Sequence, residues 1–480
     1  MRRKREGRGR VVLGRIADGV GRTLGAVTDL ATAPFTDTTI RLGVTGLSRA
    51  GKTVFITSLV ANLMDRGRMP QLLAAANGAI RTAYLQPQPD DTVPRFPFED
   101  HMARLLAPEP SWPEGTRSVS ELRLSLRVQP TGLLSGLSGP RTVHLDIIDY
   151  PGEWLLDLGL MDKSFARWSE AVLARARTRA QAAEFLALLD ATDPAKPLDE
   201  GAARGLAEAF TGYLRAAREA GYADLTPGRF LLPGDLAGSP VLTFAPLPPG
   251  HFPRRSLGRE LARRYDSYRR NVVTPFFRDH FARLDRQIVL VDVLGAIAAG
   301  PRAVEDLRLA MADILSAFSP GRMPFLARLL GARRIDRVLI AATKADHLHH
   351  SQHPALTALA EALLREARDR ADFAGARTAA MSIAALRATV EDEVTRDGRT
   401  VGVVRGRLEG SDRAVAFHPG ELPADPGRIL STARAGGADW AGAGFRDARL
   451  APPVLRLEPG EGPPHIRLDK AAQFLIGDRL

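Results

Sequence analysis

The sequence contains no cysteine among its 480 residues. This absence excludes disulfide bonds, thiolate nucleophiles and thiolate metal sites, and it fits a reducing cytoplasm. The sequence also lacks a run of about 18 apolar residues, the length that a membrane-spanning helix needs. Its best apolar stretch, residues 288–299, is shorter and is interrupted by Asp292. With 45% hydrophobic and 25% charged residues, the chain has the composition of a globular protein, and we expect it in the cytoplasm.

Lysine is scarce, although the formal net charge is +11. Nearly all of the positive charge comes from arginine, and the six lysines are Lys4, Lys52, Lys163, Lys196, Lys344 and Lys470. A chain that uses arginine elsewhere keeps lysine where a compact ammonium on a flexible stem is needed. Two of the six, Lys52 and Lys344, fall in the nucleotide motifs described below, which supports a nucleotide site.

The N-terminal segment is basic. Residues 2–10 form an arginine-rich arm, and residues 13–27 place apolar side chains on one helical face. One interpretation is peripheral contact of this helix with the anionic inner membrane surface. We favour the other, a frayed tail followed by an ordinary docking helix, because the apolar face is modest and lacks Trp and Phe. We expect no specific nucleic-acid binding, since no basic stripe interleaved with aromatic residues is present.

Residues 46–53 (GLSRAGKT) match G-x-x-x-x-G-K-[ST], the phosphate-binding P-loop. A β-branched strand pattern precedes the motif at residues 40–45, and an apolar helical pattern follows it. Backbone N–H groups of such a loop wrap the phosphates, and the helix N-terminus faces them. Lys52 is then placed to reach the β- and γ-phosphates and Thr53 to bind Mg²⁺. The phosphate-binding residues expected from the motif are Gly46, Ser48, Arg49, Ala50, Gly51, Lys52, Thr53 and Val54.

A second nucleotide motif follows a predicted antiparallel hairpin. Residues 122–128 alternate apolar and polar side chains as an edge strand does, and residues 143–149 form its partner. The second strand ends in Asp-Tyr-Pro-Gly, an Asp-x-x-Gly pattern. In GTPases such an Asp reaches Mg²⁺ and the Gly N–H meets the γ-phosphate. We therefore assign these roles to Asp149 and Gly152.

The base-recognition motif is expected after a strand at residues 337–342, in Thr343-Lys344-Ala345-Asp346. A carboxylate at Asp346 can accept from both guanine N1–H and N2–H₂, whereas adenine lacks this donor pair. The Lys344 stem is expected to lie along the base. Thr343 replaces the Asn of the usual Asn-Lys-x-Asp motif and keeps only part of its hydrogen bonding, which leaves an ATPase or P-loop kinase open as an alternative.

The last core strand, residues 377–385, ends in Ser-Ile-Ala-Ala. GTPases place a loop here whose backbone N–H contacts guanine O6, so Ser382, Ile383 and Ala384 are candidates, with a plain strand end as the rival interpretation.

Four histidines lie within seven residues just after the base motif: His347, His349, His350 and His353. A metal pair of His349 and His353 at helical spacing is conceivable. We favour a polar loop beside the base pocket, with His347 next to the base, because no acidic ligand accompanies the histidines in the sequence.

The remaining segments are expected to be helices, strands and insertions. Residues 65–118 are proline-rich and are predicted to be irregular, the long switch I region, because long loops in compact domains tend to be functional. Its switch threonine, a Mg²⁺ ligand, is assigned to Thr116, with Ser118, Ser120 and Thr92 as alternatives. Other predictions are helices at 164–180, 199–221, 257–286 with a kink at Pro275, 303–318 and 354–371, and strands at 185–190 and 286–294.

These residues together resemble a known family, the YcjX-like P-loop GTPases of bacteria. The likeness rests on residues 42–53, 149–154, 286–294 and 341–347 and on the ending 466–480. The resemblance implies a GTPase core with inserted segments, a cytoplasmic protein and a stress-linked role.

The expected fold is α/β, a P-loop NTPase with a Ras-like GTPase core: a mixed, mostly parallel sheet flanked by helices. A helical insertion and a small β-containing C-terminal insertion interrupt it. The expected segments are a basic arm and amphipathic helix (1–36), the first part of the core (37–198), the helical insertion (199–286), the second part of the core (287–394), a small insertion (395–460) and a C-terminal helix (461–480).

The expected activity is hydrolysis of GTP to GDP by a slow, Mg²⁺-dependent regulatory switch. Glu153 stands where Ras-like GTPases place the water-positioning glutamine, and a carboxylate cannot donate to the γ-phosphate. We therefore predict slow turnover, assisted by a protein partner or another side chain. Arg49 is a candidate arginine finger in cis, although we favour its facing solvent or a partner. A nucleotide-gated membrane or partner scaffold with negligible turnover is a further alternative.

Overall fold

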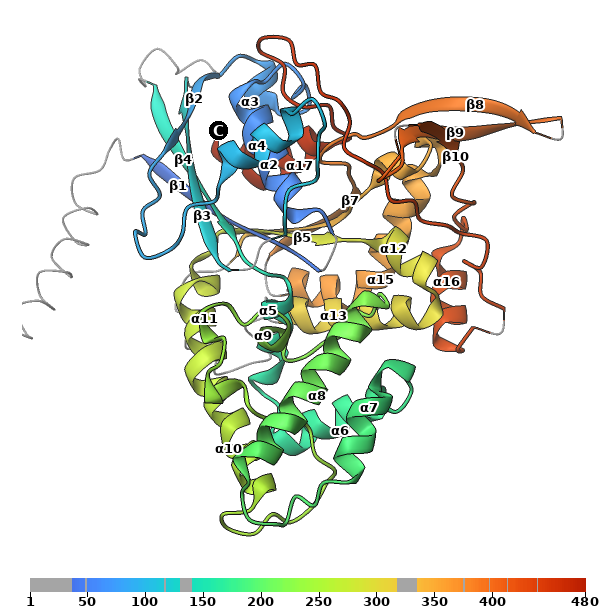
Figure 1. The fold of residues 1–480 in the computed structure, drawn as a ribbon. Coiled ribbons are helices and arrows are strands. Elements are labelled where there is room, and N and C mark those ends of the chain that lie inside the picture. The colour runs from blue at the N-terminus through green and yellow to red at the C-terminus, as the bar shows by residue number, and fades with distance from the viewer. Residues whose placement is uncertain are drawn as a thin grey trace, which may run out of the picture.

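The computed structural model describes residues 37–47, 50–115, 118–129, 140–316, 335–373, 376–396, 398–411, 413–437 and 439–480 (Figure 1). The predicted N-terminal arm, Ser48, Arg49 and Thr116 lie outside these residues. Within the described residues, seven strands form one sheet in the order β2-β3-β4-β1-β5-β6-β7. They are β1 (Thr38–Gly46), β2 (Ile80–Gln86), β3 (Ser120–Val128), β4 (Arg141–Asp149), β5 (Arg286–Val291), β6 (Arg337–Ala342) and β7 (Arg377–Ser382).

Neighbouring strands pair in parallel except around β3, which is antiparallel to both β2 and β4. Because parallel strands put their carboxyl ends at one edge, the loops after β1, β4, β5, β6 and β7 meet there. Apolar side chains alternate between the two faces of the central strands. In β5, for example, Ile288 and Leu290 contribute to one core, and Val289 and Val291 to the other. Both faces must therefore be covered by helices.

One face of the sheet is covered by helices from opposite ends of the chain (Figure 1). They are α2 (Lys52–Met64), α3 (Leu73–Ala76), α4 (Phe98–Leu106) and α17 (Leu468–Ile476). Phe55 and Leu59 of α2 pack in the same core as Leu468 and Leu475 of α17. The C-terminal helix is thus an integral part of the core that carries the P-loop motif.

The opposite face carries α5 (Glu153–Leu156), α12 (Val293–Ala299), α13 (Pro301–Ser316), α15 (His353–Phe373) and α16 (Pro426–Arg434). Beyond them lies a helical lobe (Figure 1). It comprises α6 (Phe165–Ala176), α7 (Ala183–Asp190), α8 (Glu200–Glu219), α9 (Gly228–Leu231), α10 (Leu257–Tyr268) and α11 (Thr274–Asp279). Its centre is aromatic: Trp168 stacks on Tyr265 at 4.8 Å between ring centroids and meets Phe244 edge-on.

The longest helix of this lobe, α8, shows why these residues fold as they do. Asp199 caps its N-terminus by accepting from the Gly201 N–H at 2.7 Å. Its buried residues recur at three- and four-residue spacing: Ala203, Leu206, Ala207, Phe210, Tyr213, Leu214 and Ala217. This spacing forms one apolar stripe that packs into the lobe.

A small antiparallel sheet follows the core strands, in the order β10-β9-β8. Its strands are β8 (Val390–Arg396), β9 (Arg399–Arg407) and β10 (Ala414–Phe417), and it extends to one side of the molecule (Figure 1). The expected fold class is confirmed: a P-loop-type α/β core carries a helical insertion and a small β-containing insertion. Among the helices of the described ranges, none combines the length and apolar composition that a bilayer span requires.

Three local predictions were wrong. Residues 185–190, predicted as a buried strand, lie in α7, where Phe185 and Leu189 are buried one turn apart. The segment 65–118 is not wholly irregular, because it contains α3, β2 and α4. As a result β3 is not an edge strand: β2 pairs along its outer side. Near Pro275, where a kink was predicted, the helix contains a π-helical turn at Arg269–Val273. Such turns are irregularities within α-helices.

Candidate functional site

The P-loop has the predicted strand, loop and helix. β1 ends at Gly46, and α2 begins at Lys52. Gly51 precedes the helix at φ +75°, in the left-handed region that a side chain disfavours. Ala50, also expected at the phosphates, donates its N–H to the Leu47 carbonyl at 3.1 Å. Gly51, Lys52 and Thr53, at the start of α2, line the cavity described below, and a helix N-terminus in that place favours an anion.

Lys52, Thr53 and Asp149 converge at the start of α2. The Lys52 ammonium forms an ion pair with Asp149, whose side chain is 1% exposed. The Thr53 hydroxyl donates to the Glu114 carbonyl at 3.2 Å. A hydroxyl and a carboxylate are hard oxygen donors of the kind that Mg²⁺ prefers, so these two side chains fit the ion.

Gly152 lies directly against the P-loop. A Cβ built on Gly152 would come within 2.0 Å of the Gly46 carbonyl oxygen. Only glycine permits this approach between two backbones that are more than 100 positions apart in the chain. The Asp-x-x-Gly turn is thus held against the P-loop, as the sequence predicts for a turn whose Gly N–H meets the γ-phosphate.

Glu153 follows this turn and is buried, with 7% of the residue exposed. Burial raises the pKa of its carboxyl, although the charges of Arg218 and Lys52 oppose the shift. The Arg218 guanidinium Nη1 lies 3.9 Å from the Glu153 Oε1. Arg218 belongs to α8 of the helical lobe, so an inserted segment reaches the phosphate end of the site.

At the other end of the site, β6 leads into Thr343 and Lys344. The Thr343 N–H donates to the Val291 carbonyl at 3.0 Å, which joins the base motif to β5. Lys344 has φ +61°, and its ammonium contacts Asp292 at 2.6 Å and Asp447 at 3.3 Å. Burial acts to lower the pKa of Lys344, but the two carboxylates outweigh it and raise that pKa. The charged ammonium holds three loops together here.

Asp346 is only 4% exposed. Its Oδ2 accepts from the Ala388 N–H at 2.8 Å, and its backbone carbonyl accepts from the Thr389 hydroxyl. These bonds fix the carboxylate at the cavity wall. A carboxylate has about four acceptor sites, so Asp346 retains capacity for the two adjacent donors of a guanine.

The strand end after β7 differs in detail from the prediction. The Ser382 N–H donates to Thr357 at 3.1 Å, and the Ile383 N–H donates to the Ala342 carbonyl at 2.8 Å. The Ala384 N–H donates to the Ile466 carbonyl at 3.0 Å. Within the described residues, the Ala385 N–H makes no hydrogen bond, and Ala385 lines the cavity. The N–H groups of Ser382, Ile383 and Ala384, the predicted candidates for guanine O6, are thus paired with other groups in this structure, whereas that of Ala385 is not.

The histidines after the base motif divide into two groups. His347 contacts Asp447 at 3.1 Å, at the cavity wall. The buried His353 donates from Nε2 to the Ala345 carbonyl at 2.8 Å, and among the described residues the ligand atoms near His349 come from His350 and Glu391. The conceivable metal pair of His349 and His353 is therefore not formed.

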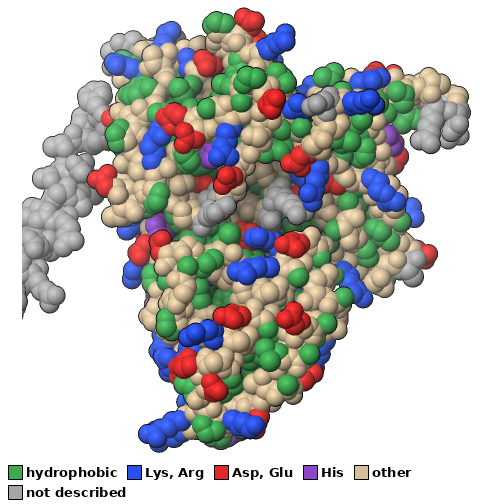
Figure 2. Space-filling model, in the orientation of Figure 1, with side chains coloured by type: hydrophobic (Ala, Val, Ile, Leu, Met, Phe, Trp, Pro, Cys, Tyr) green, Lys and Arg blue, Asp and Glu red, His purple; other side chains and the backbone are tan. Residues whose placement is uncertain are grey.

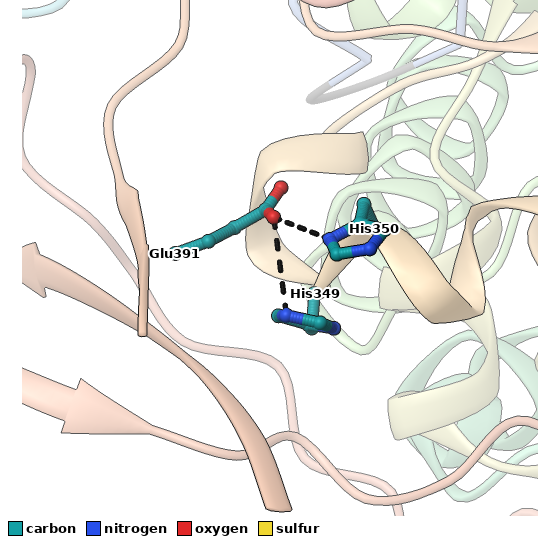
Figure 3. A group of neighbouring side chains, drawn as sticks. All are labelled: His349, His350 and Glu391. Carbon is teal, nitrogen blue, oxygen red and sulfur yellow. Dashed lines mark hydrogen bonds and ion pairs between the residues drawn. The ribbon is translucent and has the colours of Figure 1, made fainter. Parts of the chain in front are cut away.

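Figure 3 shows His349 and His350 facing Glu391 of β8. The Glu391 Oε2 lies 2.6 Å from the His350 Nδ1 and 3.9 Å from the His349 Nε2. The Arg387 guanidinium lies 3.5 Å from the same side chain's carboxylate. The cluster ties the base loop to the small sheet.

A cavity of about 960 Å³ connects the two ends of the site. Its wall combines the P-loop, Glu153, the base motif and the Asp447 region. Trp112, also in the wall, donates from its indole N–H to the Leu450 carbonyl at 2.7 Å. Acidic and basic side chains gather across the middle of the face shown in Figure 2. The size and the lining suit a nucleoside triphosphate, with the phosphates at α2 and the base at β6.

Sequence reasoning did not identify Asp292, Asp447, Trp112 and Arg218 as parts of this wall. Asp292 could have been found from its place at the end of a core strand. Arg218 and Asp447 lie in insertions and Trp112 lies in the proline-rich segment 65–118, where the sequence contains no pattern that indicates a contact with the P-loop.

Comparison with known proteins agrees with this geometry. Residues 40–480 match the YcjX-like family, DUF463. A protein of Escherichia coli (strain K12) named "Ras-like GTPase YcjX" is 36% identical over 460 residues, which cover 92% of this chain and 96% of the relative. A Shewanella oneidensis (strain MR-1) protein of the same name is 35% identical over 473 residues, 92% of this chain and 95% of the relative.

Proposed function

Since this chain belongs to the YcjX-like family, we propose that it binds GTP and hydrolyses it to GDP and phosphate as a slow, Mg²⁺-dependent switch. The observation that carries the proposal is the single cavity that joins the P-loop to the buried Asp346 carboxylate. Phosphate-binding and base-binding groups at opposite ends of one cavity are what a nucleotide requires.

Guanine is proposed over adenine because of Asp346. Ala388 holds one carboxylate oxygen, and the remaining acceptor sites match guanine N1–H and N2–H₂. Adenine would leave the acceptor sites that face the base without donors, and such unpaired buried sites cost binding free energy. Thr343 stands where the usual motif has Asn, and both its N–H and its hydroxyl donate to the Val291 carbonyl. We therefore expect the exchange to affect the structure of the loop more than the contact with the base.

Slow turnover is proposed because of Glu153. In Ras-like GTPases a glutamine orients the attacking water, and a buried carboxylate can accept from that water but cannot donate to the phosphate. Its negative charge also opposes that of the γ-phosphate. A nucleotide-gated scaffold with negligible turnover is therefore the second candidate, favoured by the same burial of Glu153.

Thermal unfolding with GDP, GTP and ATP, each with Mg²⁺, tests the proposal. A ligand at 100 times its Kd should stabilise the native protein by about 2.7 kcal/mol. We expect a rise in Tm with GDP and GTP, a much smaller one with ATP, and phosphate release from GTP. Lys52→Ala should abolish the nucleotide-induced rise in Tm, whatever its effect on the Tm of the free protein.

Lys470→Ala is the matched control, because Lys470 is an exposed lysine on α17. Its nucleotide-induced shift should equal that of the wild type. A larger shift with ATP than with GTP would refute the guanine assignment in favour of an ATPase or kinase. GTP binding with no phosphate release in a single turnover would support the scaffold instead.

A further inference from the structure

The end of α8 brings a cationic side chain to the phosphate end of the cavity. Arg218, in the last turn of this helix, lines the cavity together with Lys52 and Glu153. The segment that follows, residues 219–223, lines it as well. The contact is therefore made by a whole stretch of the helical lobe that faces the P-loop.

Arg218 differs from three buried arginines of this protein, Arg179, Arg264 and Arg286, in what it contacts. Arg179, Arg264 and Arg286 each donate hydrogen bonds to carboxylates and hold elements together. Within the described residues, Arg218 donates no hydrogen bond, and its contact with Glu153 is 3.9 Å long. Its side chain is 31% exposed, on the cavity side. A guanidinium has five N–H donors in a planar fork, and here it lines the cavity to which the proposed function assigns the phosphates.

The position of Glu153 identifies which part of the nucleotide Arg218 would meet. Glu153 follows Gly152, whose backbone touches Gly46 of the P-loop. Lys344 and Asp346 lie at the base end of the cavity, next to Asp292 and Ala388. Arg218 is thus beside the expected γ-phosphate.

We propose that Arg218 is an arginine finger supplied in cis by the helical lobe. The inference rests on the proposed GTPase function and names a catalytic residue for it. The guanidinium donates to a γ-phosphoryl oxygen and to the bridging oxygen as negative charge builds on them. It also offsets the charge of Glu153, which lets that carboxylate accept from the attacking water despite the nearby phosphate.

In this reaction the water oxygen bonds to the γ-phosphorus as the bond from phosphorus to the bridging oxygen breaks. The bond's electron pair leaves with GDP, and both water protons remain on the product H₂PO₄⁻. The donor that Glu153 cannot supply comes from α8. From the sequence, Arg49 of the P-loop is a candidate arginine finger, and we assign this role to Arg218 instead.

Single-turnover GTP hydrolysis and GDP binding by Arg218→Ala test the proposal. We expect the hydrolysis rate to fall about 10³-fold, the lower end of the effect of an arginine finger, while the Kd for GDP changes less than about threefold. Arg218→Lys should recover little of the rate, because an ammonium lacks the planar fork. Arg215→Ala, an exposed arginine on the same helix, should match the wild type.

Binding of GDP with aluminium fluoride, which mimics the γ-phosphoryl group during transfer, provides a second measurement. A variant that still binds GDP but not this complex has lost a transition-state contact and not its fold. The wild type and Arg215→Ala should bind it, and Arg218→Ala should not, although all three bind GDP. In a Glu153→Gln background, Arg218→Ala should still slow hydrolysis at least about 100-fold. If the effect vanishes in that background, Arg218 serves only to neutralise Glu153, and the proposal is overturned.

Different results would contradict the proposed GTPase function and the role of Arg218 as an arginine finger. A wild-type protein that binds no guanine nucleotide would remove the proposed function and the finger with it. A wild type that hydrolyses GTP, with Arg218→Ala within threefold of its rate, would overturn the finger alone. Weaker GDP binding by Arg218→Ala with an unchanged rate would likewise make Arg218 a binding residue and overturn its catalytic role.

Discussion

Two glycines allow the turn at Gly152 and Glu153 to pack closely against the P-loop on one side and against α9 on the other. Gly152 approaches Gly46 so closely that a methyl group would overlap the Gly46 carbonyl. Gly228, on the other side, would place a Cβ 1.9 Å from the Glu153 carbonyl. The Gly152–Glu153 turn is therefore enclosed between backbone groups of the P-loop and α9. If a nucleotide displaces this turn, either the P-loop or α9 must move with it.

Gly152→Ala tests this enclosure. We expect it to lower the free energy of unfolding by about 1–3 kcal/mol, as overpacking of a tight site does, and to weaken GTP binding more than GDP binding. Gly212→Ala is the control, since Gly212 is exposed on α8 with open space around it. Replacement of a helical glycine should stabilise the protein by about 0.5–1 kcal/mol. Similar urea midpoints for the two variants would show that the turn is not tightly packed.

At the scale of elements, the switch loop is joined to the helical lobe by buried polar contacts. Asp157 accepts from the Gly228 N–H at 2.7 Å and from the Tyr268 hydroxyl. Trp154 donates to the Leu232 carbonyl at 2.9 Å, and the Arg229 guanidinium lies 3.1 Å from the centroid of its ring. The segment proposed to sense the γ-phosphate is thus bonded to residues of α9 and α10, and under the proposed function a movement of this segment would reach the helical lobe.

Asp157 makes this junction sensitive to pH. Burial raises the pKa of Asp157 to about 6, against about 3.8 in an unfolded chain, although bonds from Tyr268 and Gly228 oppose the shift. Between these values the native state holds the proton more tightly, so this group's contribution to stability falls as the pH rises from 4 to 6. Above pH 6 the buried charge costs on the order of 3 kcal/mol, since one pKa unit corresponds to about 1.4 kcal/mol.

Asp157→Asn should remove this dependence, because an amide can accept from Gly228 and donate to the Tyr268 oxygen. We expect the variant to exceed the wild type by about 1–3 kcal/mol at pH 7 and to match it at pH 4, measured by urea unfolding. Asp162→Asn, at an exposed position nearby, should show no such pH-dependent difference. A constant difference between Asp157→Asn and the wild type from pH 4 to 7 would contradict this account.

Elements that carry a motif were predictable from the sequence, and elements that depend on distant packing were not. The P-loop, the β3–β4 hairpin and the Asp-x-x-Gly turn follow from local patterns, and the structure contains them. Residues 185–190 form a short apolar run, which fits a buried strand or a helix equally well. Contact with α8 decides for a helix. β2 escaped prediction because prolines follow it and its pairing partner, β3, lies more than 30 residues downstream.

The same limit applies to the site. Asp346 and Lys52 were predictable because their roles are tied to short motifs. Asp447, which contacts Lys344 and His347, lies about 100 residues after them in a segment with no recognisable pattern. Only the folded chain brings it to the base motif.

At the scale of the whole molecule, the insertions enclose the nucleotide cavity from both sides. The helical lobe contributes Arg218, and the C-terminal insertion contributes Asp447 and Leu450. Leu450 also holds Trp112 of the switch I region. The core lines the cavity with its motifs, and the insertions supply the additional groups that complete the wall. Under the proposed function, a nucleotide in this cavity would be bordered by segments from nearly the whole described chain.

The central claim is that a guanine base is read by Asp346, and a change of base specificity tests it most directly. Guanine presents two donors to this carboxylate, whereas xanthine presents one donor and one acceptor, which match the amide of an Asn. Competition binding should show that the wild type prefers GDP to xanthosine diphosphate, and that Asp346→Asn reverses this preference while retaining the bond from Ala388. If Asp346→Asn keeps its preference for GDP, or if neither protein distinguishes the two bases, Asp346 does not read the base and the account is contradicted.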